Sequence, residues 1–213
     1  MKNRHWNRIL LDNRGLTLVE LMIVLVLSLM LMAAVFMTFQ LQHASSRAQT
    51  EVAATQQDIR AAMDIIALDI MHAGLSQDPS VKILGIPGGT SGTDTLRLEN
   101  DGTVDGVTRV IYRLNNGNLE RDLDIGVTQV IANNVTSLTF AYRGTTTDGG
   151  SQDIVPAMGG TLTQDQARTV RFIRVAITKE SEQVDAQTGQ PVQRTLSRWV
   201  CRRNGDIDEI SVP

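Results

Sequence analysis

Apolar side chains form one long uninterrupted run near the start of the chain. Residues 21–39 contain no charged residue, no Pro and no Gly, and only Ser28 and Thr38 are polar. A helix rises about 1.5 Å per residue, so this run is long enough to cross the roughly 30 Å hydrocarbon core of a bilayer. The pattern therefore predicts a transmembrane helix over about residues 16–39, with one carboxylate, Glu20, near its N-terminal end.

The helical pattern continues beyond this run but becomes amphipathic. No Pro or Gly occurs between residues 40 and 73, and apolar residues recur there at spacings that place them on one helical face. Gly74 follows at the position where a left-handed residue commonly ends a helix. We therefore predict one helix over residues 16–73, with too few heptads for a coiled coil. The face expected to pack on a globular domain consists of Val52, Ile59, Met63, Ile66 and Ile70.

Residues 74–213 have the composition of a β-rich domain. Short runs rich in Val, Ile, Thr and Tyr alternate with turn residues, and no helical pattern intervenes, so the sheet should be mainly antiparallel. Asn115-Asn116-Gly117-Asn118 predicts a β-hairpin. Residues 144–168 are expected to be a loop with one helical turn at residues 164–168. The predicted strands are 81–86, 95–99, 107–114, 119–123, 127–132, 135–142, 169–178 and 192–201. The fold class is thus α+β, a long N-terminal helix packed on an antiparallel sheet.

The charge of the chain is divided unevenly between its two ends. Residues 1–15 carry +3 and the remainder carries −6, for a total of −3. By the positive-inside rule, a basic segment before the apolar run predicts a cytoplasmic N-terminus and a periplasmic domain over residues 74–213. The acidic remainder offers no basic stripe, so we expect no nucleic-acid partner. The only cysteine, Cys201, allows no internal disulfide, and we expect it to be a small apolar residue in a strand.

A short motif joins the basic segment to the apolar run. It is Arg14-Gly15-Leu16-Thr17-Leu18-Val19-Glu20, with the carboxylate at the fifth position after the Gly. This arrangement resembles the signature of the type IV prepilin family, although Leu16 stands where Phe is usual. The resemblance implies that a membrane prepilin peptidase cuts after Gly15, removes the leader 1–15 and methylates the new amine of Leu16. It also implies that Glu20 docks against a neighbouring subunit by compensating its N-terminal amine.

Two other interpretations of the N-terminal segment lead to different mature chains. In an ordinary signal anchor, residues 1–15 would stay attached and Glu20 would reach toward the headgroups. A cleaved secretory signal would have a shorter apolar region followed by a small-residue site, which residues 40–44 do not supply. The sequence therefore favours a chain that keeps its apolar helix.

Weaker similarities extend the resemblance into the rest of the chain. The segments Asp69–Leu75, Asn134–Tyr142 and Arg194–Asn204 are similar to segments of PilW-type minor pilins, and GspJ-type minor pseudopilins share the general layout. Major pilins commonly carry a Gly and a Pro inside the membrane half and a disulfide-bounded loop, which this chain lacks.

These similarities imply a minor pilin that primes or caps a pilus. Its expected partners are the prepilin peptidase/methyltransferase, other minor and major pilins through the N-terminal helix, and the inner membrane. We expect a single-pass protein of the inner membrane that later joins the pilus at the cell surface. The alternatives are a pseudopilin of a type II secretion system and an anchored binding module that never polymerises.

No pattern in the sequence indicates catalysis. The chain has no nucleophile elbow, zinc-binding H-E-x-x-H, P-loop or dinucleotide fingerprint, so we expect neither an enzyme nor a cofactor. Two acidic segments, residues 100–106 and residues 206–209, contain oxygen ligands that calcium uses. Neither has the spacing of an EF-hand, and Asp-Gly is above all a turn sequence, so we predict no metal site.

Overall fold

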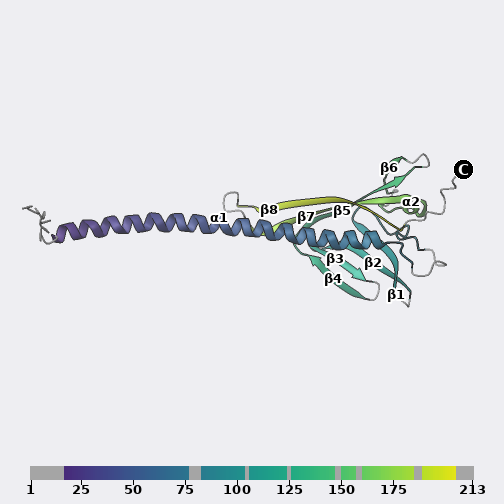
Figure 1. The fold of residues 1–213 in the computed structure, drawn as a ribbon, viewed down its shortest axis with the longest axis horizontal. Coiled ribbons are helices and arrows are strands. Elements are labelled where there is room, and N and C mark those ends of the chain that lie inside the picture. The colour runs from purple at the N-terminus through teal and green to yellow at the C-terminus, as the bar shows by residue number, and fades with distance from the viewer. Residues whose placement is uncertain are drawn as a thin grey trace, which may run out of the picture. The chain divides into compact units, whose positions relative to one another are not determined.

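The computed structural model describes residues 17–76, 83–103, 106–123, 126–146, 150–156, 160–184 and 189–204. The chain forms two compact units, Met1–Arg47 and Ala48–Pro213. Helix α1 extends over Leu18–His72, close to the predicted 16–73 (Figure 1). No Pro or Gly lies within it, so each interior residue can take part in the helical hydrogen bonding.

Gly74 ends α1 as the sequence predicts, and the structure adds a second reason for Gly at this position. Its φ is +80°, in the left-handed region. The N–H of Leu75 donates to the carbonyl of His72 at 2.9 Å, which satisfies one of the last carbonyls of the helix. A Cβ on Gly74 would also lie 2.2 Å from the carbonyl oxygen of Asn204, so a side chain would force the backbone apart.

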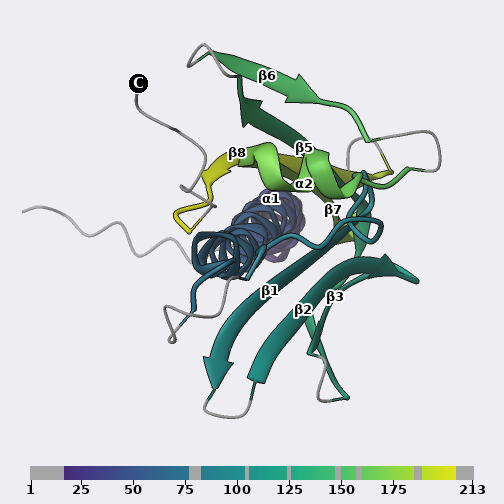
Figure 2. The same cartoon turned by 90° about the vertical axis from the view of Figure 1, so that its right-hand side faces the viewer.

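The described strands form two four-stranded sheets, and every pairing within them is antiparallel, as predicted. The first sheet has the order β1-β2-β3-β4 and the second has the order β6-β5-β7-β8 (Figure 2). The first sheet consists of β1 (Thr95–Thr103), β2 (Gly106–Asn115), β3 (Asn118–Leu123) and β4 (Val127–Ala132). The second consists of β5 (Val135–Thr145), β6 (Ser151–Ile154), β7 (Val170–Val184) and β8 (Pro191–Cys201).

Two left-handed turns determine how the chain passes between these strands. Asn116 and Gly117 have φ of 49° and 78°, the combination of a type I′ turn, and they connect β2 to β3 in the predicted hairpin. Asn134 has φ of 54° and lies between β4 and β5, where the chain leaves the first sheet for the second. The strands expected in one sheet therefore divide into two.

The core lies where the C-terminal part of α1 packs between the two sheets (Figure 2). The predicted apolar face is confirmed at Ile59, Met63, Ile66 and Ile70, which are all buried, whereas Val52 is only half-buried. Alternate residues of β5 complete the core from the second sheet, as the period-two pattern predicts. The largest fully buried side chains on the strands are those of Leu96, Tyr112, Leu119, Tyr142 and Ile173.

Two predictions between the strands were wrong or incomplete. The predicted strand 81–86 is loop over residues 83–86, and its first two residues lie outside the described ranges. The predicted loop 144–168 contains β6, which pairs with the end of β5. The helical turn in that loop is confirmed as α2 (Gln164–Thr169), which begins at Thr163 with a capping box.

Candidate functional site on the N-terminal helix

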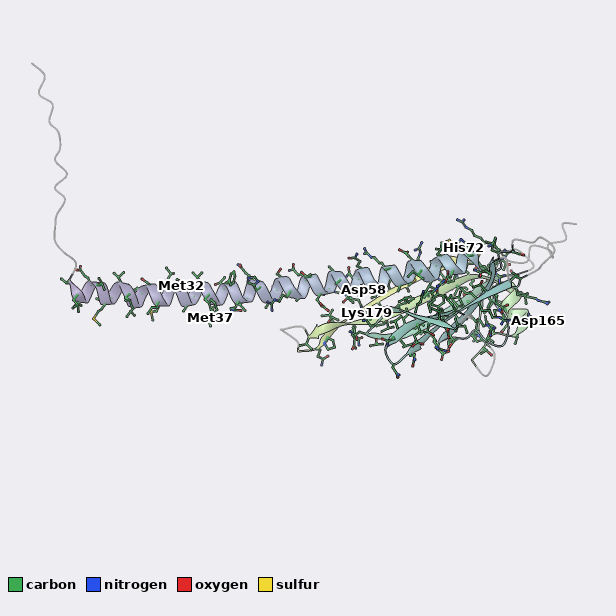
Figure 3. All side chains as sticks on the ribbon, turned by 90° about the horizontal axis from the view of Figure 1, so that it is seen from below. Met32, Met37, Asp58, His72, Asp165 and Lys179 are labelled. Carbon is green, nitrogen blue, oxygen red and sulfur yellow. The ribbon has the colours of Figure 1, made fainter. Side chains whose placement is uncertain are left out.

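The first unit presents apolar side chains that nothing in its described residues covers. Every residue from 17 to 50 is exposed, and the large hydrophobic side chains from Leu18 to Leu41 are between 53 and 75 % exposed. Figure 3 shows Met32 and Met37 extending outward from the helix. An apolar surface of this extent requires lipid or other protein as its surroundings. α1 is long and apolar enough to cross a membrane.

The two polar side chains inside the apolar run are satisfied by the helix itself. The hydroxyl of Ser28 donates to the carbonyl of Val24 at 2.6 Å, and that of Thr38 donates to the carbonyl of Ala34 at 3.0 Å. In hydrocarbon an unsatisfied hydroxyl would be costly, since no water is present to bond it. These residues therefore leave the segment compatible with a membrane.

Glu20 lies in the first turn of α1 and closes a capping box with Thr17. The Thr17 hydroxyl accepts the N–H of Glu20 at 3.2 Å, and Oε2 of Glu20 accepts the N–H of Thr17 at 3.1 Å. The Thr17 hydroxyl also donates to Oε2 at 3.0 Å. A carboxylate at this position satisfies otherwise unpaired N–H groups and is favoured by the helix dipole. None of these three contacts uses Oε1, which therefore accepts no hydrogen bond from the residues that the structure describes.

Thr17 was not among the predicted site residues, although its signal is present in the sequence. Thr17 and Glu20 are three residues apart, the spacing of a capping box just before an apolar run. The predicted cleavage residues Gly15 and Leu16 lie outside the described residues, so their site stays a prediction. The structure therefore places Glu20 and adds Thr17 beside it.

The comparison with known families bears on the same segment. Residues 11–36 match the prokaryotic N-terminal methylation motif. The match includes Gly15, Leu16 and Glu20 and supports a relationship with type IV prepilin-like proteins, pilins and pseudopilins among them. No curated protein matches the chain. The matched region ends within the apolar run, so it carries no information on the two sheets.

In the second unit, ion pairs attach α1 to both sheets. Oδ2 of Asp69 accepts the hydroxyl of Tyr112 at 2.5 Å and Nε of Arg121 at 2.8 Å, both from the first sheet. Burial and the Asp69 carboxylate raise the pKa of the Tyr112 phenol well above its usual value. Since the phenol stays protonated, it acts as a hydrogen-bond donor to the helix over the whole physiological range.

The contacts with the second sheet involve residues of α1 that precede Asp69 by about one and three helical turns. Nζ of Lys179, which is 4 % exposed, donates to Asp58 at 2.5 Å, and Figure 3 shows the two residues facing each other. Nη1 of Arg198 donates to Asp64 at 3.1 Å on a more exposed surface. Removal of Asp58 would leave a buried ammonium without this carboxylate, so the pair fixes how α1 lies on the sheet.

Other predicted candidates do not form a site within the described residues. No group of three or more His, Cys, Asp or Glu side chains that could hold a metal occurs there. Part of the acidic segment 100–106 and all of residues 206–209 lie outside those ranges. Cys201 ends β8, so its predicted position in a strand is confirmed, and it is an exposed free thiol.

Proposed function

We propose that this protein is a minor type IV pilin, a structural subunit that primes or caps a pilus after cleavage at Gly15 and N-methylation of Leu16. The observation that carries the proposal is the capped carboxylate of Glu20 at the end of an exposed apolar helix. The methylation motif that spans both features supports it. The role is structural, and the apolar helix supplies the surface through which subunits associate.

Glu20 performs two tasks in this proposal. In the isolated chain its Oε2 caps α1, which keeps the carboxylate ordered at the start of the apolar segment. In the assembly its charge compensates the N-terminal amine of an adjacent subunit, since an amine enters an apolar bundle only with an opposite charge nearby. Oε1 is the atom that this amine can reach without breaking the capping box.

The basic leader determines on which side of the membrane each part of the chain lies. Residues 1–15 hold the N-terminus in the cytoplasm, so the peptidase acts on that side of the inner membrane and residues 74–213 reach the periplasm. The mature helix then leaves the bilayer to join other pilin helices. A pseudopilin of a type II secretion system is the second candidate, since the methylation motif is common to pilins and pseudopilins.

The proposal is tested by the intact mass of the chain extracted from native membranes. The expected mature chain begins at Leu16 and carries one added methyl group. Gly15→Leu should leave the precursor uncut, whereas Leu16→Phe, which introduces the usual residue, should be processed normally. A native chain that retains residues 1–15 is a membrane anchor and not a pilin.

The second measurement separates the two machines. The mature chain is purified from detergent-solubilised membranes, and the co-purifying methylated subunits are identified by mass spectrometry. Subunits of a pilus support the first candidate, and subunits of a type II secretion system support the second.

A further inference from the structure

The C-terminal end of the apolar run carries the first basic side chains after the leader. Residues 21–50 contain no Asp or Glu, and His43 and Arg47 are the only residues among them that can carry a positive charge. They follow Phe39 by four and eight residues, and four residues make slightly more than one helical turn. All three residues are exposed. His43 and Arg47 therefore lie on the same side of α1 as the last aromatic ring of the run.

The structure shows in which direction the imidazole of His43 extends. Its ring centroid lies 4.2 Å from that of Phe39, and the two ring planes meet at 76° in an edge-to-face contact. Side chains on a helix lean toward its N-terminus, and this contact holds the imidazole in that direction, next to the apolar run. An imidazole has at least one N–H in either protonation state, so His43 can donate a hydrogen bond there.

The length of the run determines what surrounds these side chains in a membrane. Residues 21–39 rise about 29 Å, close to the roughly 30 Å of a hydrocarbon core, and the polar headgroup layer beyond the core is about 5–8 Å thick. Along the helix axis, the Cα of His43 lies about 6 Å beyond that of Phe39, and the Cα of Arg47 lies about 12 Å beyond it. The long side chain of Arg47 also leans back toward the N-terminus, so both basic groups can reach the headgroup layer.

We propose that His43 and Arg47 bind the phosphate of an anionic phospholipid at the membrane surface where the apolar run ends. A guanidinium and an imidazole N–H both donate hydrogen bonds to phosphate oxygens. No carboxylate of residues 21–50 opposes the negative charge of the lipid. The site fixes the depth at which α1 lies in the bilayer.

Lipid is favoured over a protein partner because the site continues the apolar surface of the same helix. The large hydrophobic side chains from Leu18 to Leu41 are exposed, and in a chain anchored in a membrane they lie in lipid. The headgroups of that lipid then surround the next turns of α1. The proposal depends on α1 crossing the membrane and does not depend on processing at Gly15.

Photocrosslinking of the full-length chain in vesicles tests this site. A photoreactive residue replaces Gln40, which precedes Arg47 by two helical turns and lies on the same side of α1. The vesicles contain equal amounts of phosphatidylglycerol, which is anionic, and phosphatidylcholine, which has no net charge. Mass spectrometry of the adducts gives the ratio of the two lipids beside residue 40. Because this reading is local, the basic leader at the other membrane surface does not contribute to it.

The chain without further substitutions should give more adducts with phosphatidylglycerol than with phosphatidylcholine. Arg47→Gln should lower this ratio about fivefold, the effect of one basic residue near an anionic surface, and His43→Ala together with Arg47→Gln should bring it close to one. Arg60→Gln is the matched control and should leave the ratio unchanged, because Arg60 is exposed on the same helix about 20 Å beyond Arg47. Protease resistance of residues 74–213 checks that each variant is folded. An unchanged ratio in the double variant, an equal loss with Arg60→Gln, or adducts at residue 40 with protein alone would each overturn the proposal.

Discussion

The two halves of α1 have the same secondary structure but opposite relations to the rest of the chain. Between residues 17 and 50 every side chain is exposed, and from Leu18 to Leu41 apolar residues occupy all sides of the helix. Between residues 55 and 70 one apolar face, which includes Ile59, Met63 and Ile66, is buried between the sheets, whereas Ile65 and Leu68 outside it are exposed. The periodicity of the apolar residues, and not their number, therefore decides whether a helix packs against its own chain.

Polar groups distinguish the two halves in the same way. The polar side chains of the first half bond to their own helix, as Ser28, Thr38 and Glu20 do. Those of the second half bond to distant strands, as Asp58 and Asp69 do. The first half therefore satisfies these polar groups within its own helix and can lie in lipid or among other helices. The second half is bonded to the strands of one domain.

The largest effect is expected at Glu20, where capping and charge can be separated. Gln can also close a capping box, so Glu20→Gln removes the charge but keeps the cap, and Glu20→Leu removes both. If the charge docks a neighbouring amine, both variants should be cleaved yet almost completely lose co-purification with other pilin-type subunits. A cleavage blot and a pull-down from solubilised membranes measure the two steps. Normal assembly of Glu20→Gln would reduce the role of Glu20 to capping.

The next effect concerns the buried face of the second half. Ile66→Ala should lower the free energy of unfolding by about 2–5 kcal/mol, because Ile66 is fully buried and its truncation leaves a cavity. Leu68→Ala is the matched control, since Leu68 is 50 % exposed on the same helix and should change it by less than about 0.5 kcal/mol. Urea unfolding in detergent gives both values. Equal losses would show that the two residues occupy similar environments.

A smaller effect is expected from single hydrogen bonds in the core. Tyr112→Phe removes the donor to the Asp69 carboxylate and should cost about 1.5–3 kcal/mol, the range of bonds to charged groups. Tyr142→Phe removes a bond to the neutral carbonyl of Gly92 and should cost about 0.5–1.5 kcal/mol. The same urea experiment compares them. A larger loss at Tyr142 would contradict the assignment of Asp69 as the charged partner.

The smallest effect is a pH dependence at Glu120. Hydrogen bonds from Asn115 and Arg113 lower the pKa of this carboxyl below its ordinary value of 4.5. Its contribution to stability is therefore complete above pH 4.5 and is lost as the pH falls below it. Glu120→Gln should be less stable than the native chain at neutral pH, and this difference should shrink with acid. A constant difference from pH 7 to pH 3 would rule out titration of Glu120 as its source.

Local signals in the sequence predict much of this fold. The absence of Pro and Gly from residues 16–73 predicts the length of α1, and Asn116-Gly117 predicts the turn between β2 and β3. Both depend on the conformational preferences of single residues. The same reasoning predicts where Glu20 lies, and it could have identified Thr17 as its capping partner.

Contacts between distant residues could not be predicted in this way. Asp58 and Lys179 are 121 residues apart, and Asp69 and Arg121 are 52 apart, so no spacing in the sequence relates them. The division into two sheets depends on which strands pair, and period-two patterns do not encode the partner. β6 is too short and too polar for such a pattern to emerge.

Site-specific photocrosslinking at two positions of α1 distinguishes the surroundings of its two halves. A photoreactive residue replaces Leu27, which is 59 % exposed in the first half, or Ile66, which is fully buried in the second, in the full-length chain in native membranes. Leu27 should form adducts with lipid and with other pilin-type subunits, and Ile66 should form adducts within the same chain only. Intrachain adducts alone at Leu27 would contradict it, because the apolar half would then find its partner inside the protein.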